Sequence, residues 1–188
     1  YDAYRLILAC AVPSFFTGLI DDLFFDIKPI FRILLMLPTP ILLFYFAGIR
    51  ITDLGVGMFD DFLNIEIFSL LFICFALTGM SNAFNIIDGF NGLVLGYTLA
   101  VGLSVIFFGT FDDSFFINQL VYSLFFAVLG VFVINFPFGK IFLGDGGAYL
   151  LGIFVPVSLI LYQKINMLSP WFVMLMLIYP FTEVLSSV

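Results

Sequence analysis

Long, uninterrupted apolar runs dominate the chain and decide what it can fold into. A helix that crosses a bilayer needs about 20 mostly apolar residues, and continuous apolar runs lack the alternation of membrane β-strands. The runs therefore predict an all-α, polytopic membrane helix bundle with about seven transmembrane helices. In order, the runs cover residues 4–20, 33–49 (interrupted by Pro38 and Pro40, which predict a kink), 65–80, 93–108, 117–136, 148–162 and 171–185.

The composition agrees with a chain dissolved in lipid. Hydrophobic residues make up 63% of the 188 and charged residues 10%, whereas soluble domains are about half apolar and a quarter charged. We expect residues 1–188 to form a single integral-membrane core. The chain starts beside an apolar run without an initiator Met and stops just after another, so we expect a fragment of a longer protein.

Charge and residue usage exclude several classes of function. The net charge of −7 argues against nucleic-acid binding, because no basic patch could neutralise phosphates. Histidine is absent, which excludes a His-based metal site or triad within these residues. Cys10 and Cys74 lie in separate apolar runs, so we interpret both as packing residues and expect no disulfide.

The polar connections sort onto two sides, because consecutive spans cross the membrane in opposite directions. Connections 21–31, 81–92 and 135–147 share one side, here called side A, and connections 50–64, 109–116 and 163–170 share the other, side B. Lysines and arginines divide equally, so the positive-inside rule does not orient the chain. Side A carries Asp21, Asp22, Asp26, Asn82, Asn85, Asp88, Asn91, Asn135, Lys140 and Asp145, and side B carries Asp53, Asp60, Asp61, Glu66, Asp112 and Asp113.

The first polar motif on side A is the pair Asp21-Asp22, which follows an apolar run. Adjacent carboxylates at a membrane boundary repel each other unless water, a cation or a base lies beside them. The pair predicts a base or a magnesium-diphosphate site, and the alternative is an ordinary hydrated helix end. Asp26 extends the motif to D-D-x-x-x-D, and Lys28 and Arg32 could offset its charge.

The second motif occupies residues 81–92. If the segment is helical, Asn82 and Asn85 lie one turn apart on the same face, and Asp88 follows one turn later. Amide groups both donate and accept hydrogen bonds, which suits a uridine, a sugar or a phosphate. The alternative is a polar turn, where Asn, Asp and Gly are common in any case.

The third motif is Gly-Asp-Gly-Gly around Asp145, which opens the sixth run. It places a carboxylate beside flexible backbone N–H groups at the positive end of a helix. Such an arrangement can hold a diphosphate with its Mg²⁺, which prefers carboxylate and phosphate oxygens. The alternative is a simple N-cap role for Asp145. Because all three motifs fall on side A, one shared site requires no further assumption.

These motifs resemble, in order along the chain, those of the polyprenyl-phosphate N-acetylhexosamine-1-phosphate transferases (glycosyl transferase family 4). This family includes undecaprenyl-phosphate GlcNAc-1-phosphate transferases and phospho-MurNAc-pentapeptide translocases. Residues 18–23 (GLIDDL) resemble its aspartate pair, residues 82–89 (NAFNIIDG) its Asn-x-x-Asn-x-x-Asp-Gly motif, and residues 140–147 (KIFLGDGG) its metal-binding Gly-Asp motif.

The resemblance implies a multi-pass enzyme of the bacterial cytoplasmic membrane whose site faces the cytoplasm, with a homodimer suiting the family. The enzyme would transfer a sugar-1-phosphate, expected to be N-acetylhexosamine-1-phosphate, from a UDP-sugar to undecaprenyl or another polyprenyl phosphate. It would use Mg²⁺, with Mn²⁺ as an alternative, release UMP and initiate a cell-envelope glycan. The implied catalytic residues are Asp21, Asp22 and Asp88, the substrate-binding residues Asn82, Asn85, Asn91 and Lys140, and the metal ligand Asp145.

The chain also departs from the family pattern. Asn91 stands where many members carry a second Asp, and Ala148 lacks the hydroxyl of the usual Ser. The family's early helices would precede residue 1, and its His-rich loop would follow residue 188.

An ion or proton-coupled transporter is the rival class, and a non-catalytic relative is a further one. A transporter would line a path through the bundle with carboxylates near the middle of its helices. The carboxylates here gather at helix ends on one side, which favours the enzyme.

Overall fold

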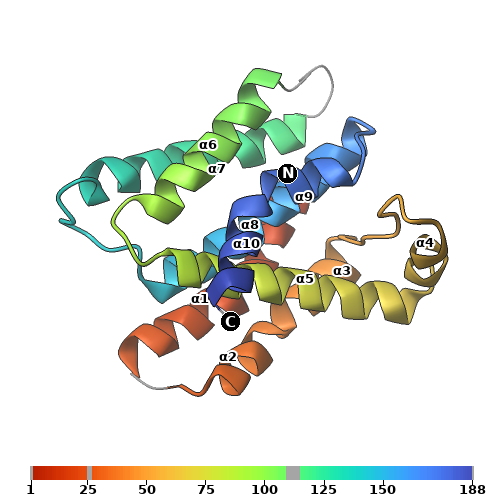
Figure 1. Cartoon of the computed structure of the whole chain (residues 1–188), viewed down its shortest axis with the longest axis horizontal. Helices are drawn as coiled ribbons and strands as arrows, with labels where there is room; N and C mark the ends of the chain where they lie inside the picture. Colours follow the sequence, from red (N-terminus) through yellow and green to blue (C-terminus); the bar gives the residue numbers. More distant parts are fainter. Residues whose placement is uncertain (1, 25–26, 109–114, 188) are drawn as a thin grey trace.

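The computed structural model of the chain describes residues 2–24, 27–108 and 115–187, and within these residues all regular structure is helical (Figure 1). The helices are α1 (Asp2–Leu23), α2 (Pro29–Met36), α3 (Pro38–Phe46), α4 (Gly57–Leu63), α5 (Glu66–Ile87), α6 (Leu93–Phe108), α7 (Phe115–Asn135), α8 (Gly144–Ile165), α9 (Trp171–Met176) and α10 (Ile178–Ser187).

The expected all-α polytopic membrane bundle is confirmed. Over the described residues, five helical stretches are long and apolar enough to cross a membrane, and α6 is a shorter apolar helix. The seventh apolar run is divided between α9 and α10, and the short helix α4 within connection 50–64 was not predicted. The five stretches are Arg5–Leu23, Pro29–Phe46, Glu66–Ile87, Ile117–Asn135 and Gly144–Ile165.

Prolines explain the two interrupted spans. Pro38 and Pro40 have no N–H to donate, so the helix breaks at Leu37 between α2 and α3, where a kink is expected from the sequence. Pro180 likewise cannot donate to the carbonyl of Met176, where α9 ends. The hydroxyl of Tyr97 donates to that carbonyl instead, so the break leaves no buried acceptor unsatisfied there.

Helix α8 is the centre of the bundle, and all residues from 151 to 160 are buried. Figure 1 shows α8 running through the middle of the molecule, with α1 and α5 beside it. The helices approach closely where one or both residues are small, as is common in membranes. A Cβ added to Gly18 of α1 would lie 2.4 Å from Cα of Gly146, and one added to Gly152 would lie 2.5 Å from Cα of Ser81 in α5.

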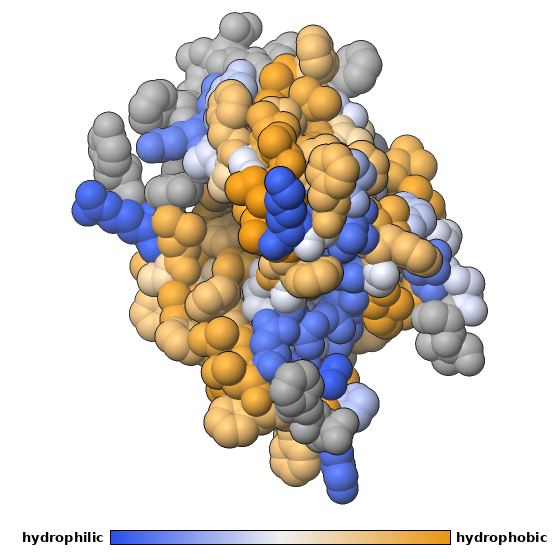
Figure 2. Space-filling view, turned by 90° about the vertical axis from the view of Figure 1, so that its left-hand side faces the viewer, coloured by the Kyte–Doolittle hydropathy of each residue, from blue (hydrophilic) through white to orange (hydrophobic). Residues whose placement is uncertain are grey.

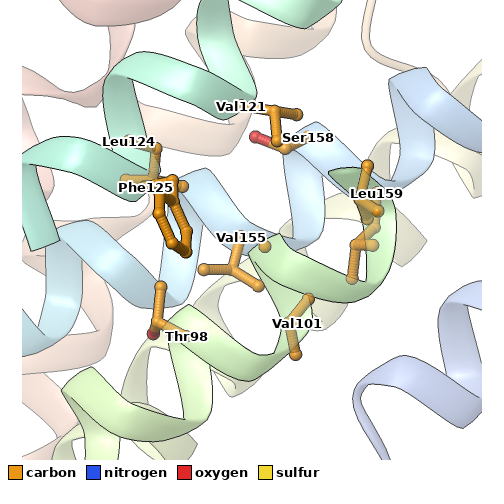
Figure 3. A pocket seen from close by; sticks show the side chains of 10 residues that line it. Thr98, Val101, Val121, Leu124, Phe125, Val155, Ser158 and Leu159 are labelled. Atoms are coloured by element: carbon orange, nitrogen blue, oxygen red, sulfur yellow. The ribbon is translucent and has the colours of Figure 1, made fainter. Parts of the chain in front are cut away.

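Helices α6 and α7 pack as a pair on the other flank of α8. A cavity of about 20 Å³ lies between the three helices, and aliphatic side chains such as Val121, Val155 and Leu159 line most of it (Figure 3). The Thr98 hydroxyl at its edge is buried and has no hydrogen-bond partner among the residues that the structure describes. This space is large enough for about one water molecule, so it belongs to the core and could not hold a substrate.

Candidate active site

Three helix ends meet on side A: the C-terminal ends of α1 and α5 and the N-terminal end of α8. The close packing of Gly18 on Gly146 brings the aspartate pair of α1 to the first turn of α8. Figure 2 shows hydrophilic side chains gathered into a patch with hydrophobic surface around it, on the face that lies at the left of Figure 1. Residues more than 120 positions apart in the sequence thereby become neighbours.

Asp22 binds the start of α8. Its Oδ1 accepts a hydrogen bond of 2.9 Å from the N–H of Asp145, and its Oδ2 accepts one of 3.3 Å from the N–H of Gly146. First-turn N–H groups have no partner within their own helix, and a carboxylate there also interacts favourably with the helix dipole. This contact explains why α8 begins at Gly144 rather than near residue 148, where the apolar run begins.

Asp21 points into the protein, although it is adjacent to Asp22 in sequence. It is 5% exposed, and its Oδ2 lies 2.9 Å from Nε of Arg32 and 3.1 Å from the hydroxyl of Tyr149. Arg32 was one of two cations expected to offset the aspartate pair; Lys28, the other, is exposed. Asp26, which would extend the motif, lies outside the described residues.

Tyr149 lies just beyond the Gly-Asp motif and was not among the site residues predicted from the sequence. It lies four residues after Asp145 on α8, so the two side chains share a helix face. That spacing is the sequence signal that could have pointed to it. Its ring is fully buried, so its hydroxyl is directed at Asp21 rather than at solvent.

Asp145 meets the second motif. Its Oδ1 accepts a 2.7 Å hydrogen bond from Nδ2 of Asn85 near the end of α5. Its carboxyl also lies within hydrogen-bonding reach of Asp21. Asp145 does not cap the helix, since Leu143 precedes its first residue and the carboxylate faces a neighbouring helix. Asp145 is therefore the point at which α1, α5 and α8 make polar contact.

Asp88 completes the acidic group at the residue that follows α5. Burial, together with the nearby carboxylates of Asp145 and then Asp22, raises the pKa of Asp88 from 3.8 to about 6. Desolvation and neighbouring negative charge both disfavour the ionised form. The site thus concentrates negative charge that the described cations only partly compensate.

The raised pKa of Asp88 predicts how pH acts on stability. Between about pH 4 and 6 the folded state holds a proton on Asp88 that the unfolded state has released, so this contribution is present below about pH 4 and is lost as pH rises through 6. Thermal unfolding in detergent with EDTA should therefore show a smaller fall in midpoint from pH 4.5 to 7.5 for Asp88→Asn than for the unmodified protein. Parallel curves for the two proteins would contradict this assignment.

Three predicted substrate-binding residues lie apart from this group. The amide of Asn82 donates to the carbonyl of Thr78 at 2.9 Å and lies 3.9 Å from the sulfur of Met36. Asn91 is exposed and packs against Gly139, and Lys140 is exposed with its ammonium 5.9 Å from the centroid of the Phe138 ring. No contact between these residues and the four aspartates is seen in the described part of the chain, so their roles stay predictions.

Where they are described, the acids of side B lie in the loop before α4, in α4 itself or at the start of α5. The carboxylate of Asp60 accepts hydrogen bonds from the N–H groups of Leu54, at 2.7 Å, and Val56, at 2.9 Å. It therefore closes the loop that leads into α4. Asp112 and Asp113 lie outside the described residues.

The donor set suits a magnesium ion that arrives with a phosphate ligand. Among the described residues, no group of three or more His, Cys, Asp or Glu side chains is placed to hold a metal. Mg²⁺ is usually bound by one or two carboxylates, with phosphate oxygens and water filling the other positions. Asp145 with Asp21 or Asp22 provides such a pair, so the residues fit Mg²⁺ shared with a diphosphate.

Comparison with known proteins gives consistent similarities. The sequence profile of the family described as Glycosyl transferase family 4 matches residues 4–163. The undecaprenyl-phosphate alpha-N-acetylglucosaminyl 1-phosphate transferase of Thermotoga maritima is 29% identical over 177 residues, which cover 94% of this chain and 51% of that protein. The phospho-N-acetylmuramoyl-pentapeptide-transferase of Staphylococcus saprophyticus is 33% identical over 129 residues, 66% of this chain and 40% of that protein.

A phospho-N-acetylmuramoyl-pentapeptide-transferase of Streptococcus pyogenes is similar as well, at 31% identity over 132 residues, which cover 68% of this chain and 38% of that protein. The chain therefore spans about half or less of the length of these curated relatives.

Proposed function

The chain belongs to glycosyl transferase family 4, and we propose from this premise that it is the membrane core of an enzyme that transfers a sugar-1-phosphate from a UDP-sugar to a polyprenyl phosphate. The observation that carries the proposal is the meeting of Asp21, Asp22, Asp88 and Asp145 at one end of the bundle. The relatives are named for phospho-sugar transfer, one of them with undecaprenyl phosphate. A transporter gains no support, since these carboxylates do not line a path through the bundle.

The reaction is a phosphoryl transfer. An oxygen of the lipid phosphate attacks the sugar-side phosphorus of the UDP-sugar, forming a new phosphorus–oxygen bond. The bond between that phosphorus and the bridging oxygen breaks, and the electron pair leaves with UMP. A bound Mg²⁺, held by Asp145 with Asp21 or Asp22, would offset the charge that develops on the phosphate oxygens.

Other described residues orient the metal ligand and bind the phosphate groups. Asn85 orients the carboxylate of Asp145 through its 2.7 Å hydrogen bond. The N-terminal end of α8 carries a partial positive charge that favours phosphate groups. Asp22 is exposed whereas Asp21 is buried against Arg32, so Asp22 is the member of the pair that can meet the acceptor phosphate, as a base or as the nucleophile of a covalent route.

An apolar groove offers a place for the hydrocarbon tail of the acceptor. It has a cavity volume of about 290 Å³ and lies between α1, α6, α7 and α8. Leu143 and Gly147 line it, and these two residues flank Asp145 in the sequence. The groove therefore reaches the first turn of α8, the turn that carries Asp145, and continues along α7 past Ala127, which suits a lipid whose phosphate reacts at Asp145.

Filling this groove should weaken acceptor use selectively. Ala127→Phe would displace about two methylene groups of the tail, at ~0.8 kcal/mol each, and so raise the KM for undecaprenyl phosphate about tenfold. The KM for the UDP-sugar should not change. Gly130→Phe is the matched control, since Gly130 is exposed in the same helix and a Cβ there meets nothing within 4 Å. Equal KM values for the acceptor in the two variants would place the tail elsewhere.

An assay of the full-length protein tests the function itself. Detergent-solubilised protein with undecaprenyl phosphate, Mg²⁺ and a panel of UDP-sugars should release UMP with one sugar and form the corresponding lipid diphosphate. EDTA should stop the reaction, and Mg²⁺ or Mn²⁺ should restore it. In vesicles, a cytoplasmic site would use external UDP-sugar when the membranes are inverted but not when they are right-side out. No UMP release with any sugar would refute the proposal. Assembly as a homodimer, which this assay does not address, stays a prediction.

A further inference from the structure

A buried hydroxyl and a half-buried guanidinium converge on a single oxygen of Asp21. Nε of Arg32 lies 2.9 Å and the Tyr149 hydroxyl 3.1 Å from Oδ2 of this residue. Tyr149 is 0% exposed and Asp21 is 5% exposed, so solvent does not replace the hydrogen bond between them, whereas the Arg32 side chain is 29% exposed. A hydrogen bond to an ionised group is a strong one, and the hydrogen bond from Tyr149 together with the ion pair to Arg32 at the same oxygen restricts rotation of the carboxylate.

The two groups that contact Asp21 come from different helices and are themselves held in place. Arg32 lies in α2, and the single N–H of its Nε donates to the carbonyl of Ile27 at 3.0 Å, which holds the guanidinium beside Asp21. Tyr149 lies one turn after Asp145 in α8, the most buried helix of the bundle. Asp21 is thus fixed from two directions, and the carboxyl of Asp145 lies within hydrogen-bonding reach of it.

We propose that Tyr149 and Arg32 are positioning residues, which fix the carboxylate of Asp21 against Asp145 and thereby set the geometry of the acidic site. The inference rests on the proposed function. Stability alone does not require these polar side chains, because well-packed apolar side chains often stabilise a protein as well as a buried ion pair does. The convergence on Oδ2 orients the carboxylate, and that orientation matters for chemistry at its other oxygen.

Tyr149→Phe in the full-length protein removes the hydroxyl and keeps the ring. With the UDP-sugar that the unmodified enzyme uses, kcat should fall about tenfold or more, as for residues that orient a ligand of a catalytic metal. The KM for that sugar should change less than about twofold. Affinity for Mn²⁺ with UDP, measured by electron paramagnetic resonance, should weaken about tenfold.

Tyr162→Phe serves as the control, because it removes a hydroxyl from another buried tyrosine of α8, 13 residues further along. Its kcat and Mn²⁺–UDP affinity should match those of the unmodified protein, and the unfolding midpoints of the two Phe variants should agree. Arg32→Lys, which keeps a donor and a charge, should retain more turnover than Arg32→Gln.

Two results would overturn the inference. One is that Tyr149→Phe has the same kcat and the same Mn²⁺–UDP affinity as the unmodified protein. The other is a loss of turnover that accompanies a larger fall in unfolding midpoint than in Tyr162→Phe, which would make the contact merely structural. If the unmodified protein releases no UMP, the proposed function fails instead, and the Mn²⁺–UDP affinities of the two Phe variants alone decide whether Tyr149 positions the site.

Discussion

Asp145→Asn should lower phospho-sugar transfer by about a hundred- to a thousandfold, the usual loss when one group that stabilises charge in the transition state is removed. The amide has nearly the same shape, and its oxygen can still accept the 2.7 Å hydrogen bond from Asn85. The substitution therefore removes a negative charge from the site while α5 and α8 stay in contact. UMP release and the unfolding midpoint, measured on the same preparation in detergent, separate the two effects.

Asp61→Asn is the matched control for this variant. Asp61 is an exposed carboxylate in α4 on side B, so the same change of charge there should leave transfer unaltered. Transfer at the unmodified rate in Asp145→Asn would remove Asp145 from the metal site. A large fall in its unfolding midpoint would show instead that the carboxylate is needed for folding.

Gly18→Ala should both destabilise the bundle and abolish most transfer. The new Cβ would lie 2.4 Å from Cα and N of Gly146, and a backbone cannot rotate away as a side chain can. Helix α1 must then move off α8, and it carries Asp21 and Asp22 away from Asp145. Overpacking of this kind costs about 1–3 kcal/mol of folding free energy, which thermal unfolding in detergent would detect together with lost UMP release.

Gly130→Ala shows what the same chemical change does without a clash. Nothing lies within 4 Å of a Cβ at Gly130, and alanine is up to about 1 kcal/mol more favourable than glycine within a helix. Its unfolding midpoint should therefore equal or exceed that of the unmodified protein. If Gly18→Ala behaved like Gly130→Ala, α1 and α8 could not be packed as closely as the structure has them.

The membrane fold could be predicted because its main signal is local. Each apolar run is a property of consecutive residues, and burying it in lipid requires a helix, since backbone groups must find their hydrogen bonds within the segment. Alternation of the spans then places connections 21–31, 81–92 and 135–147 on one side. Alternation alone therefore predicts that Asp21, Asn85, Asp88 and Asp145 lie on the same side of the membrane, without any knowledge of packing.

The pairing of those side chains could not be predicted, because each contact depends on how closely particular helices approach. Asp21 and Asp22 are adjacent, yet one is buried with Arg32 while the other accepts the N–H groups of Asp145 and Gly146. Lys140 has the charge expected of a phosphate ligand, but the loop that carries it leaves its ammonium near the ring of Phe138.

The sequence by itself determined that the chain is a membrane helix bundle with its acidic motifs on one side, because hydrophobicity and alternation act along the chain. The tertiary structure decided the start of α8, the opposite directions of Asp21 and Asp22, and the hydrogen bond from Tyr149 to Asp21. These features depend on Gly18 meeting Gly146, a contact between residues 128 positions apart that only the packed bundle creates.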